Sequence, residues 1–247
     1  MKHLFVCGCP RSGTTALGTL LNRHPSIALG IERFKHIAMG RRGAEFGPAL
    51  FEHDRFLDIL AEDTNTIGQN KHLAKKFATT HEIRMVGDKI PRLYRRLPFL
   101  REAFPGAALV VIFRDPVAVA LSWQARADSP KDQWPAENGA DKALEEWQVS
   151  VDAVSEEAAA WGKSLTIIDY DRFFRVPDAL TLADNTRRLF SALGLKMQDT
   201  NLLRAAEALR GSAPSSGGKR EPATDIVAKA AILREGAAFQ ALMARAV

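Results

Sequence analysis

The sequence has few cysteines and no long apolar run. Cys7 and Cys9 are the only two cysteines among the 247 residues, and they form neither a CxxC pair nor a set of zinc ligands. We expect both to be buried packing residues. No segment approaches the roughly 18 apolar residues of a membrane-spanning helix, and the residues before Arg11 contain no uninterrupted apolar stretch like that of a secretory leader. We therefore expect a cytoplasmic protein with no membrane span.

A basic stripe interleaved with aromatic residues, which is typical of nucleic-acid-binding surfaces, is also missing. The net charge is +5, and the basic residues are scattered along the chain. A positive balance of this size suits nucleic acid, an acidic polymer or a pocket for a polyanionic nucleotide. Because the stripe is missing, nucleic acid is the least favoured of these partners.

The sequence also lacks a lysine directly after its glycine-rich loop. The apolar run at 3–7 predicts a buried strand, and the periodicity after the loop predicts a helix. Gly8 and Gly13 have the spacing of a P-loop, whose backbone N–H groups bind phosphate at a helix N-terminus. Nucleoside triphosphatases carry a lysine directly after the second glycine, where this chain has Thr14. We therefore expect the loop to bind one compact dianionic group rather than a metal-chelated triphosphate.

Four side chains of this loop and helix start could hold such an anion: Arg11, Ser12, Thr14 and Thr15. The alternative is a glycine turn that only connects strand to helix. We disfavour this alternative because an arginine and three hydroxyls all lie where an anion would bind.

The remaining composition is that of an ordinary globular protein, with 46% hydrophobic and 26% charged residues. A chain of this length can bury one sizeable core, so we expect a single domain over residues 1–247. Strand-like runs alternate with helical patterns, which predicts a P-loop-containing, three-layer α/β fold with a mostly parallel central sheet flanked by helices. The looser pattern at 33–78 indicates an insertion over the mouth of the site.

Charged and polar residues follow the predicted strands, where open α/β sheets bind their ligands. Lys89 ends a short strand in the segment Gly87-Asp88-Lys89. The alternative for this segment is that Asp88 pairs with a nearby arginine and Lys89 is solvated. The residues at or just beyond predicted strand ends are Arg11, Glu32, Lys89, Arg114 and Tyr170. Their shared position predicts a single site.

The apolar run at 108–113 predicts a fully buried parallel strand, with Arg114 at its tip. Asp115 and Pro116 then predict a helix start, as N-cap and first helical residue. Ser122 and Arg126 are four residues apart in this helix, so they share one face.

These motifs carry a family resemblance. The segment Pro10-Arg11-Ser12-Gly13-Thr14-Thr15 resembles the 5′-phosphosulfate loop of sulfotransferases that use 3′-phosphoadenosine 5′-phosphosulfate (PAPS), particularly the bacterial members and the tyrosylprotein branch. In the tyrosylprotein branch a glutamate general base follows the loop after a helix and a His-Pro turn. His24-Pro25 and then Glu32 have that order and spacing.

The resemblance implies roles for individual residues. Arg11 acts in catalysis and, with Ser12, Gly13, Thr14 and Thr15, binds the 5′-phosphosulfate, while Lys89 lies against the transferring group. The residues that it implies at the nucleotide's 3′-phosphate and adenine are Arg114, Ser122, Arg126, Tyr170, Lys219 and Arg220. A buried structural role for Tyr170 and a solvated loop at 211–220 stay open as alternatives. The implied donor is PAPS, and no metal is expected.

The function expected from these motifs is transfer of a sulfuryl group from PAPS to an acceptor hydroxyl or amine, with Glu32 as general base. Two alternatives are a P-loop kinase-like phosphoryl transferase and a non-catalytic nucleotide-binding protein. The acceptor class stays open among a small molecule, a carbohydrate, a lipid and a peptide. His36, His53 and His72 sit in no metal or catalytic spacing, so we assign them no role.

Overall fold

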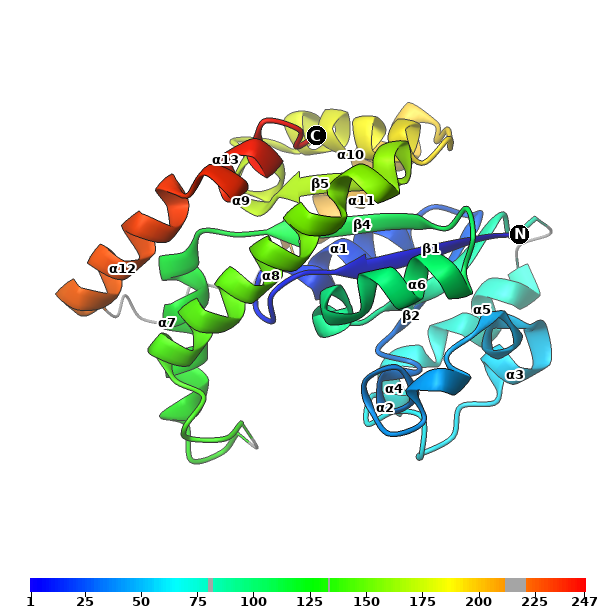
Figure 1. The fold of residues 1–247 in the computed structure, drawn as a ribbon. Coiled ribbons are helices and arrows are strands. Elements are labelled where there is room, and N and C mark those ends of the chain that lie inside the picture. Colours follow the sequence, from blue (N-terminus) through cyan, green and yellow to red (C-terminus); the bar gives the residue numbers. More distant parts are fainter. Residues whose placement is uncertain (80–81, 133, 212–220) are drawn as a thin grey trace. The chain divides into compact units, whose positions relative to one another are not determined.

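Five strands form one sheet in the spatial order β2-β3-β1-β4-β5 (Figure 1). The computed structural model describes residues 1–79, 82–132, 134–211 and 221–247. Neighbouring strands run parallel in the pairs β1–β3, β1–β4 and β2–β3. The strands are β1 (Lys2–Cys7), β2 (Ile27–Ile31), β3 (Met85–Lys89), β4 (Ala108–Phe113) and β5 (Leu165–Asp169). The α/β prediction with a mostly parallel sheet is confirmed.

The chain divides into two compact units. Unit 1 comprises Met1–Gly8, Thr14–Val111 and Glu157–Thr166, whereas unit 2 comprises Cys9–Gly13, Ile112–Glu156 and Ile167–Val247. Unit 1 therefore holds β1, β2, β3 and most of β4. The glycine loop after β1 belongs to unit 2, although the helix that follows it belongs to unit 1.

Unit 1 surrounds its strands with short helices. The first, α1, packs on β1, β2 and β3. Figure 1 shows the blue and cyan helices α2, α3, α4 and α5 gathered beside β2. The helices and 3₁₀ turns of this unit are α1 (Thr14–Leu21), α2 (Lys35–Met39), α3 (His53–Leu57), α4 (Ile67–Asn70), α5 (His72–Thr79), α6 (Leu97–Ala103), η1 (Gly43–Glu45), η2 (Pro48–Phe51), η3 (Pro91–Arg96) and η4 (Gly162–Ser164). The region at 33–78 thus folds as part of unit 1.

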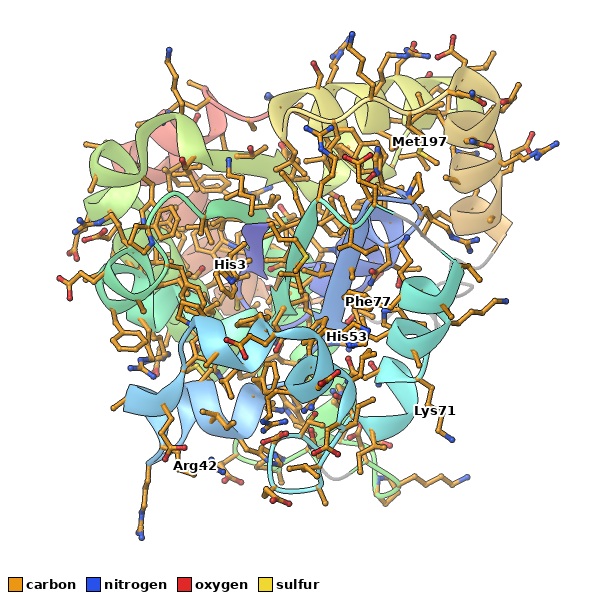
Figure 2. All side chains as sticks on the ribbon, turned by 90° about the vertical axis from the view of Figure 1, so that its right-hand side faces the viewer. His3, Arg42, His53, Lys71, Phe77 and Met197 are labelled. Atoms are coloured by element: carbon orange, nitrogen blue, oxygen red, sulfur yellow. The ribbon has the colours of Figure 1, made fainter. Side chains whose placement is uncertain are left out.

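An aromatic cluster fills the core of unit 1. Phe5 of β1 packs edge-on against Phe51 and Phe104, with ring centroids 5.7 and 4.7 Å away. Phe46 and Phe34 extend the cluster through contacts with Phe51. All five side chains are buried, so residues from the segment at 33–78 are an integral part of this core. At its edge, His53 and Phe77 meet edge to face (Figure 2).

Gly87 fixes the close approach of β3 to β1. It pairs with Leu4, and a Cβ at this position would lie 1.7 Å from the Leu4 carbonyl oxygen. Only glycine is compatible with that spacing, because no other residue lacks a Cβ. The same register pairs Lys89 with Val6, which brings Lys89 to the carboxyl end of the sheet.

Unit 2 is mainly helical. Its helices are α7 (Pro116–Ala127), most of α8 (Ala140–Trp161), α9 (Tyr170–Phe174), α10 (Ala179–Ala192), α11 (Asp199–Gly211), α12 (Thr224–Glu235) and α13 (Ala237–Met243). Asp115 caps α7, as predicted, by accepting a hydrogen bond from the Ala118 N–H. Trp147 packs between Phe113 and Phe239, and α12 lies beside α7 (Figure 1).

The stretch between β3 and β4 forms two helical pieces, η3 and then α6. Pro98 lies in the first turn of α6, where its missing N–H breaks the hydrogen-bond ladder of a continuous helix. Each helix in the described ranges is too short or too polar to span a bilayer.

Candidate functional site

The glycine loop in unit 2 is held by side chains of α7 and of the end of β4. Arg11 donates from Nε to Ser122 Oγ at 3.0 Å, and Arg114 donates from Nη1 to the Arg11 carbonyl oxygen at 3.3 Å. The sequence separations are 111 and 103 residues. The fold thus brings the predicted 5′-phosphosulfate arginine and the predicted 3′-phosphate residues together within one unit.

Two tryptophans donate hydrogen bonds to the backbone of the same region. Trp123 Nε1 donates to the Pro10 carbonyl oxygen at 2.8 Å, and Trp147 Nε1 donates to the Arg114 carbonyl oxygen at 2.9 Å. Both side chains are fully buried. Because α7 and α8 supply these donors, the loop and the strand end are fixed to helices rather than left to solvent.

Tyr170 contacts both the loop and the arginine at the end of β4. Gly13 has a φ of +97°, and a Cβ there would lie 2.4 Å from the Tyr170 ring, so glycine is required on both counts. The guanidinium carbon of Arg114 lies 4.6 Å from the Tyr170 ring centroid, in cation–π distance. Tyr170 is half-buried, so its predicted place at the adenine is compatible with its exposure.

Two buried polar atoms of this region have no hydrogen-bond partner within the described part of the chain. They are the Ser12 hydroxyl, on a fully buried residue, and the Nε of Arg114. Buried donors without partners are costly, and a bound anion would satisfy them. The residues present therefore fit a phosphate or sulfate group.

Like charges surround Arg11. Desolvation and the nearby guanidinium groups of Arg126 and Arg114 lower the pKa of Arg11, and Asp132 opposes them. Arg126, predicted as a nucleotide contact, instead makes two 2.6 Å hydrogen bonds to Asp132. Positive charge on Arg11 and Arg114 is thus left for a ligand, whereas the charge on Arg126 is already paired.

In unit 1, Lys89 links the predicted base to the first turn of α1. Its Nζ donates to Glu32 Oε1 at 3.0 Å and to Thr15 Oγ1 at 3.2 Å. Lys89 is 1% exposed, so the alternative of a solvated lysine is wrong. Glu32 also pairs through Oε2 with Lys35 Nζ at 3.0 Å.

Opposite charges control the ionisation of Glu32. Burial alone would raise its pKa, but the ammonium groups of Lys89 and Lys35 outweigh burial and lower the pKa of Glu32. The carboxylate is therefore ionised at neutral pH. This is the state in which it can accept a proton.

Asp88 holds the backbone turn that carries Glu32. Its two carboxyl oxygens accept hydrogen bonds from the N–H groups of Arg33 at 3.0 Å and Phe34 at 2.8 Å. Thr64 Oγ1 donates to the Glu32 carbonyl oxygen at 2.6 Å. Burial raises the pKa of Asp88 to about 7, against the two backbone donors and Lys89.

Arg11 and Glu32 have a further property in common. They are the two non-glycine residues with positive φ among those described, at 76° and 55°. Such conformations cost of order 1–3 kcal/mol and cluster at functional sites. Each unit therefore carries one strained backbone position, and both belong to the set predicted from the sequence.

The predicted residues divide between the units. Arg11, Ser12, Gly13, Arg114, Ser122, Arg126 and Tyr170 belong to unit 2, whereas Thr14, Thr15, Glu32 and Lys89 belong to unit 1. Lys219 and Arg220 lie outside the described residues. No sequence pattern predicts Lys35 or Asp132 as partners of site residues. The position of Asp88 directly before Lys89 is the one sequence signal for its contact with the Glu32 turn.

The strand, glycine loop and helix, with arginine in the loop and threonine in place of lysine, have the arrangement of a P-loop-like fold. Comparison with known proteins identifies the family. The chain belongs to the sulfotransferase family, because the model of that family matches residues 3–199.

Individual relatives are distant. The chain is 26% identical to nodulation protein NoeE of Sinorhizobium fredii (strain NBRC 101917 / NGR234) over 129 residues, which cover 48% of this chain and 30% of NoeE. The match thus spans less than a third of that relative's length.

Solved structures confirm the fold. A sulfotransferase from Alicyclobacillus acidocaldarius superposes with a TM-score of 0.57 at 17% identity, covering 100% of this chain and 97% of that one. Mouse sulfotransferase SULT7A1, solved as a complex with PAP, superposes with a TM-score of 0.52 at 16% identity, covering 88% and 68% of the two chains.

Proposed function

We propose that this chain transfers a sulfuryl group from PAPS to an acceptor hydroxyl or amine. The observation that carries the proposal is the grouping of Arg11, Arg114 and Ser122 around a loop whose buried Ser12 hydroxyl has no partner within the described part of the chain. Membership of the sulfotransferase family supports it. So does the PAP complex of the mouse structure.

In this proposal unit 2 supplies positive charge to both ends of the nucleotide. Arg11 and the loop from Ser12 to Thr15 bind the 5′-phosphosulfate and neutralise charge that develops on the leaving phosphate. Arg114 and Ser122 bind the 3′-phosphate, and Tyr170 lies beside the adenine. Arg126 takes part once its pairing with Asp132 is exchanged for the nucleotide.

Unit 1 supplies the base. Glu32 accepts the proton of the acceptor as the acceptor oxygen forms its bond to sulfur and the bond from sulfur to the 5′-phosphate breaks. PAPS supplies the sulfuryl group and leaves as adenosine 3′,5′-bisphosphate. Lys89 keeps Glu32 ionised and oriented, and it donates a hydrogen bond to Thr15, which the proposal assigns to phosphosulfate binding.

Chain connectivity supports joint action on one donor. Arg11 and Thr15 are four residues apart, so their Cα atoms lie within about 14 Å of each other. Thr15 in turn accepts a hydrogen bond from Lys89. In this proposal one donor is therefore bound by Arg11 and by the segment that carries Thr15.

Calorimetry and a transfer assay test the proposal. Adenosine 3′,5′-bisphosphate should bind without added metal and more tightly than ATP with Mg²⁺, because the loop lacks the triphosphate lysine. Transfer of ³⁵S from labelled PAPS to an acceptor panel should depend on Glu32. Preference for ATP with Mg²⁺ would instead support a phosphoryl transferase, and tight nucleotide binding without any transfer would support a non-catalytic binder.

A further inference from the structure

A pocket in unit 1 borders the proposed catalytic pair. Its volume is about 760 Å³, and ten residues line it, eight from α1, β2, α4 and α5 and two from the segment directly after α1. Thr15 lines one end and accepts the hydrogen bond of Lys89. Ile31, the residue before Glu32, also lines it. The volume is within the usual range for ligand sites.

Cations dominate the charged residues of this pocket. Arg23, Lys75 and Lys76 line it, whereas the ten lining residues include no aspartate or glutamate. Lys76 Nζ donates to the backbone carbonyls of Asn22 and His24, and burial lowers its pKa to about 8. Lys76 thus fixes the turn that follows α1 and forms part of the pocket lining.

Two cations remain for a ligand. Arg23 and Lys75 are exposed, and neither forms an ion pair with another described residue. They come from α5 and from the residues that follow α1, so they face one pocket from two separate segments. An occupant that carries negative charge would be bound by both.

The other lining groups indicate the rest of the occupant. Hydroxyls of Thr15, Thr19 and Thr79 and the amide of Gln69 contribute hydrogen-bonding groups. Ile31 is the one lining residue with a hydrocarbon side chain, and none of the ten is aromatic apart from histidine. Most of the exposed lining surface is nevertheless apolar, because the carbon stems of the long polar side chains contribute to it. A saccharide offers C–H faces to these stems and hydroxyls to the polar groups, whereas a purely apolar acceptor would leave the cations and hydrogen-bonding groups unmatched.

We propose that this pocket binds an acidic saccharide as the sulfuryl acceptor, with its carboxylates near Arg23 and Lys75 and a ring hydroxyl directed toward Glu32. The inference rests on the proposed function, because it names the acceptor class of the same site. The reaction is the one given above: the ring hydroxyl loses its proton to Glu32, its oxygen forms the new bond to sulfur, and adenosine 3′,5′-bisphosphate leaves.

Binding experiments test the pocket separately from catalysis. The probes are unsulfated heparosan, chondroitin and alginate oligosaccharides, each compared with the same oligosaccharide after reduction of its carboxyl groups to alcohols. Affinity is measured by calorimetry on the full chain saturated with adenosine 3′,5′-bisphosphate. At least one acidic probe should bind about tenfold or more tightly than its reduced form, and added salt should weaken it.

Charge reversal tests the two cations. The double variant R23E/K75E should weaken binding of the acidic probe about tenfold while leaving binding of adenosine 3′,5′-bisphosphate unchanged. The matched control is K71E. Lys71 directly precedes α5 and points outward (Figure 2), and it is absent from the pocket lining, so the same charge change there should have little effect.

The outcomes separate the two proposals. If adenosine 3′,5′-bisphosphate fails to bind, the proposed function is wrong. If it binds but no acidic probe exceeds its reduced form, or R23E/K75E and K71E weaken binding equally, the acidic-saccharide inference is overturned. Binding of an acidic peptide in preference to every saccharide probe would also overturn it.

Discussion

Arg11 and Glu32 have similar backbone strain but opposite electrostatic surroundings. Both have positive φ, and one lies in each unit. Arg11 has two other guanidinium groups nearby, which lower its pKa together with desolvation. Glu32 instead forms ion pairs with Lys89 and Lys35. The charge of Glu32 is already neutralised by lysines of its own unit, whereas Arg11 forms no ion pair with another described residue.

This comparison shows which of the two regions, the Glu32 turn or the Arg11 loop, depends on a bound ligand for its stability. Asp88 and Thr64 hold the Glu32 turn through three hydrogen bonds, so that turn keeps its geometry without help from a bound molecule. Around Arg11, repulsion and unpartnered buried donors raise the energy of the free loop. We therefore expect anion binding to stabilise unit 2 more than unit 1, and hydrogen exchange with and without adenosine 3′,5′-bisphosphate measures this directly.

The largest effect should come from removing the base. E32Q keeps the size and one acceptor oxygen but cannot take a proton at neutral pH. Turnover should fall about 10²- to 10⁴-fold, while calorimetric affinity for adenosine 3′,5′-bisphosphate stays near that of the unaltered protein. Weaker nucleotide binding with unchanged turnover would show that Glu32 helps to bind the nucleotide and is not the general base.

The next effect should come from Arg11. R11A removes a positive charge from the leaving phosphate and should lower kcat/KM for PAPS about 100-fold. Nucleotide affinity should fall with it, in contrast to E32Q. R188A is the matched control, since Arg188 is an exposed arginine of α10 in the same unit. Equal losses in R11A and R188A would show a general charge effect rather than a binding loop.

A smaller effect is expected on stability at Asp88. D88N leaves one of two backbone N–H groups without an acceptor, which should lower the free energy of unfolding by about 1–3 kcal/mol. The pKa of Asp88 is about 7 in the folded chain, above the ordinary 3.8. The folded state thus binds the extra proton between these values, and this contribution to stability is lost as pH rises from about 4 through 7.

Urea unfolding across that range checks the sign. The unaltered protein should lose stability relative to D88N as pH rises, because the amide does not titrate. D54N, at a fully exposed carboxylate, should follow the unaltered protein. If the difference in free energy of unfolding between the unaltered protein and D88N stays constant with pH, Asp88 does not titrate in that range.

The smallest effect concerns Lys35, whose side chain is 39% exposed. K35M removes one of the two cations that lower the pKa of Glu32, so the acid limb of the kcat profile should move to higher pH by a few tenths of a unit. High salt should reduce the difference between the two proteins. A shift in the opposite direction would mean that the limb belongs to another group.

Local patterns in the sequence predicted much of the fold. The apolar runs at 3–7 and 108–113 became β1 and β4, and the cap at Asp115 formed as predicted. These features depend on neighbouring residues, which a sequence displays directly. The loop and its arginine followed from spacing in the same way.

Contacts between distant residues were harder to predict. The bond from Arg33 to the Asp88 carboxylate spans 55 residues. Arg33 itself is fully buried beside Asp63 at 2.7 Å, although charged residues are usually exposed. Pairings of this kind depend on which segments the fold brings together. The pairing of Arg126 with Asp132 spans six residues, but Asp132 lies beyond the end of α7, where helical periodicity does not predict its position.

The two buried indoles described above are intrinsic fluorescent probes of the proposed donor site. Trp123 and Trp147 each donate a hydrogen bond to a backbone carbonyl next to or at a proposed phosphate-binding arginine, and the emission of an indole depends on the polarity and charge around it. Filling the site should therefore change the intrinsic fluorescence of the unlabelled protein. Stopped-flow mixing could then follow nucleotide entry and exit in real time.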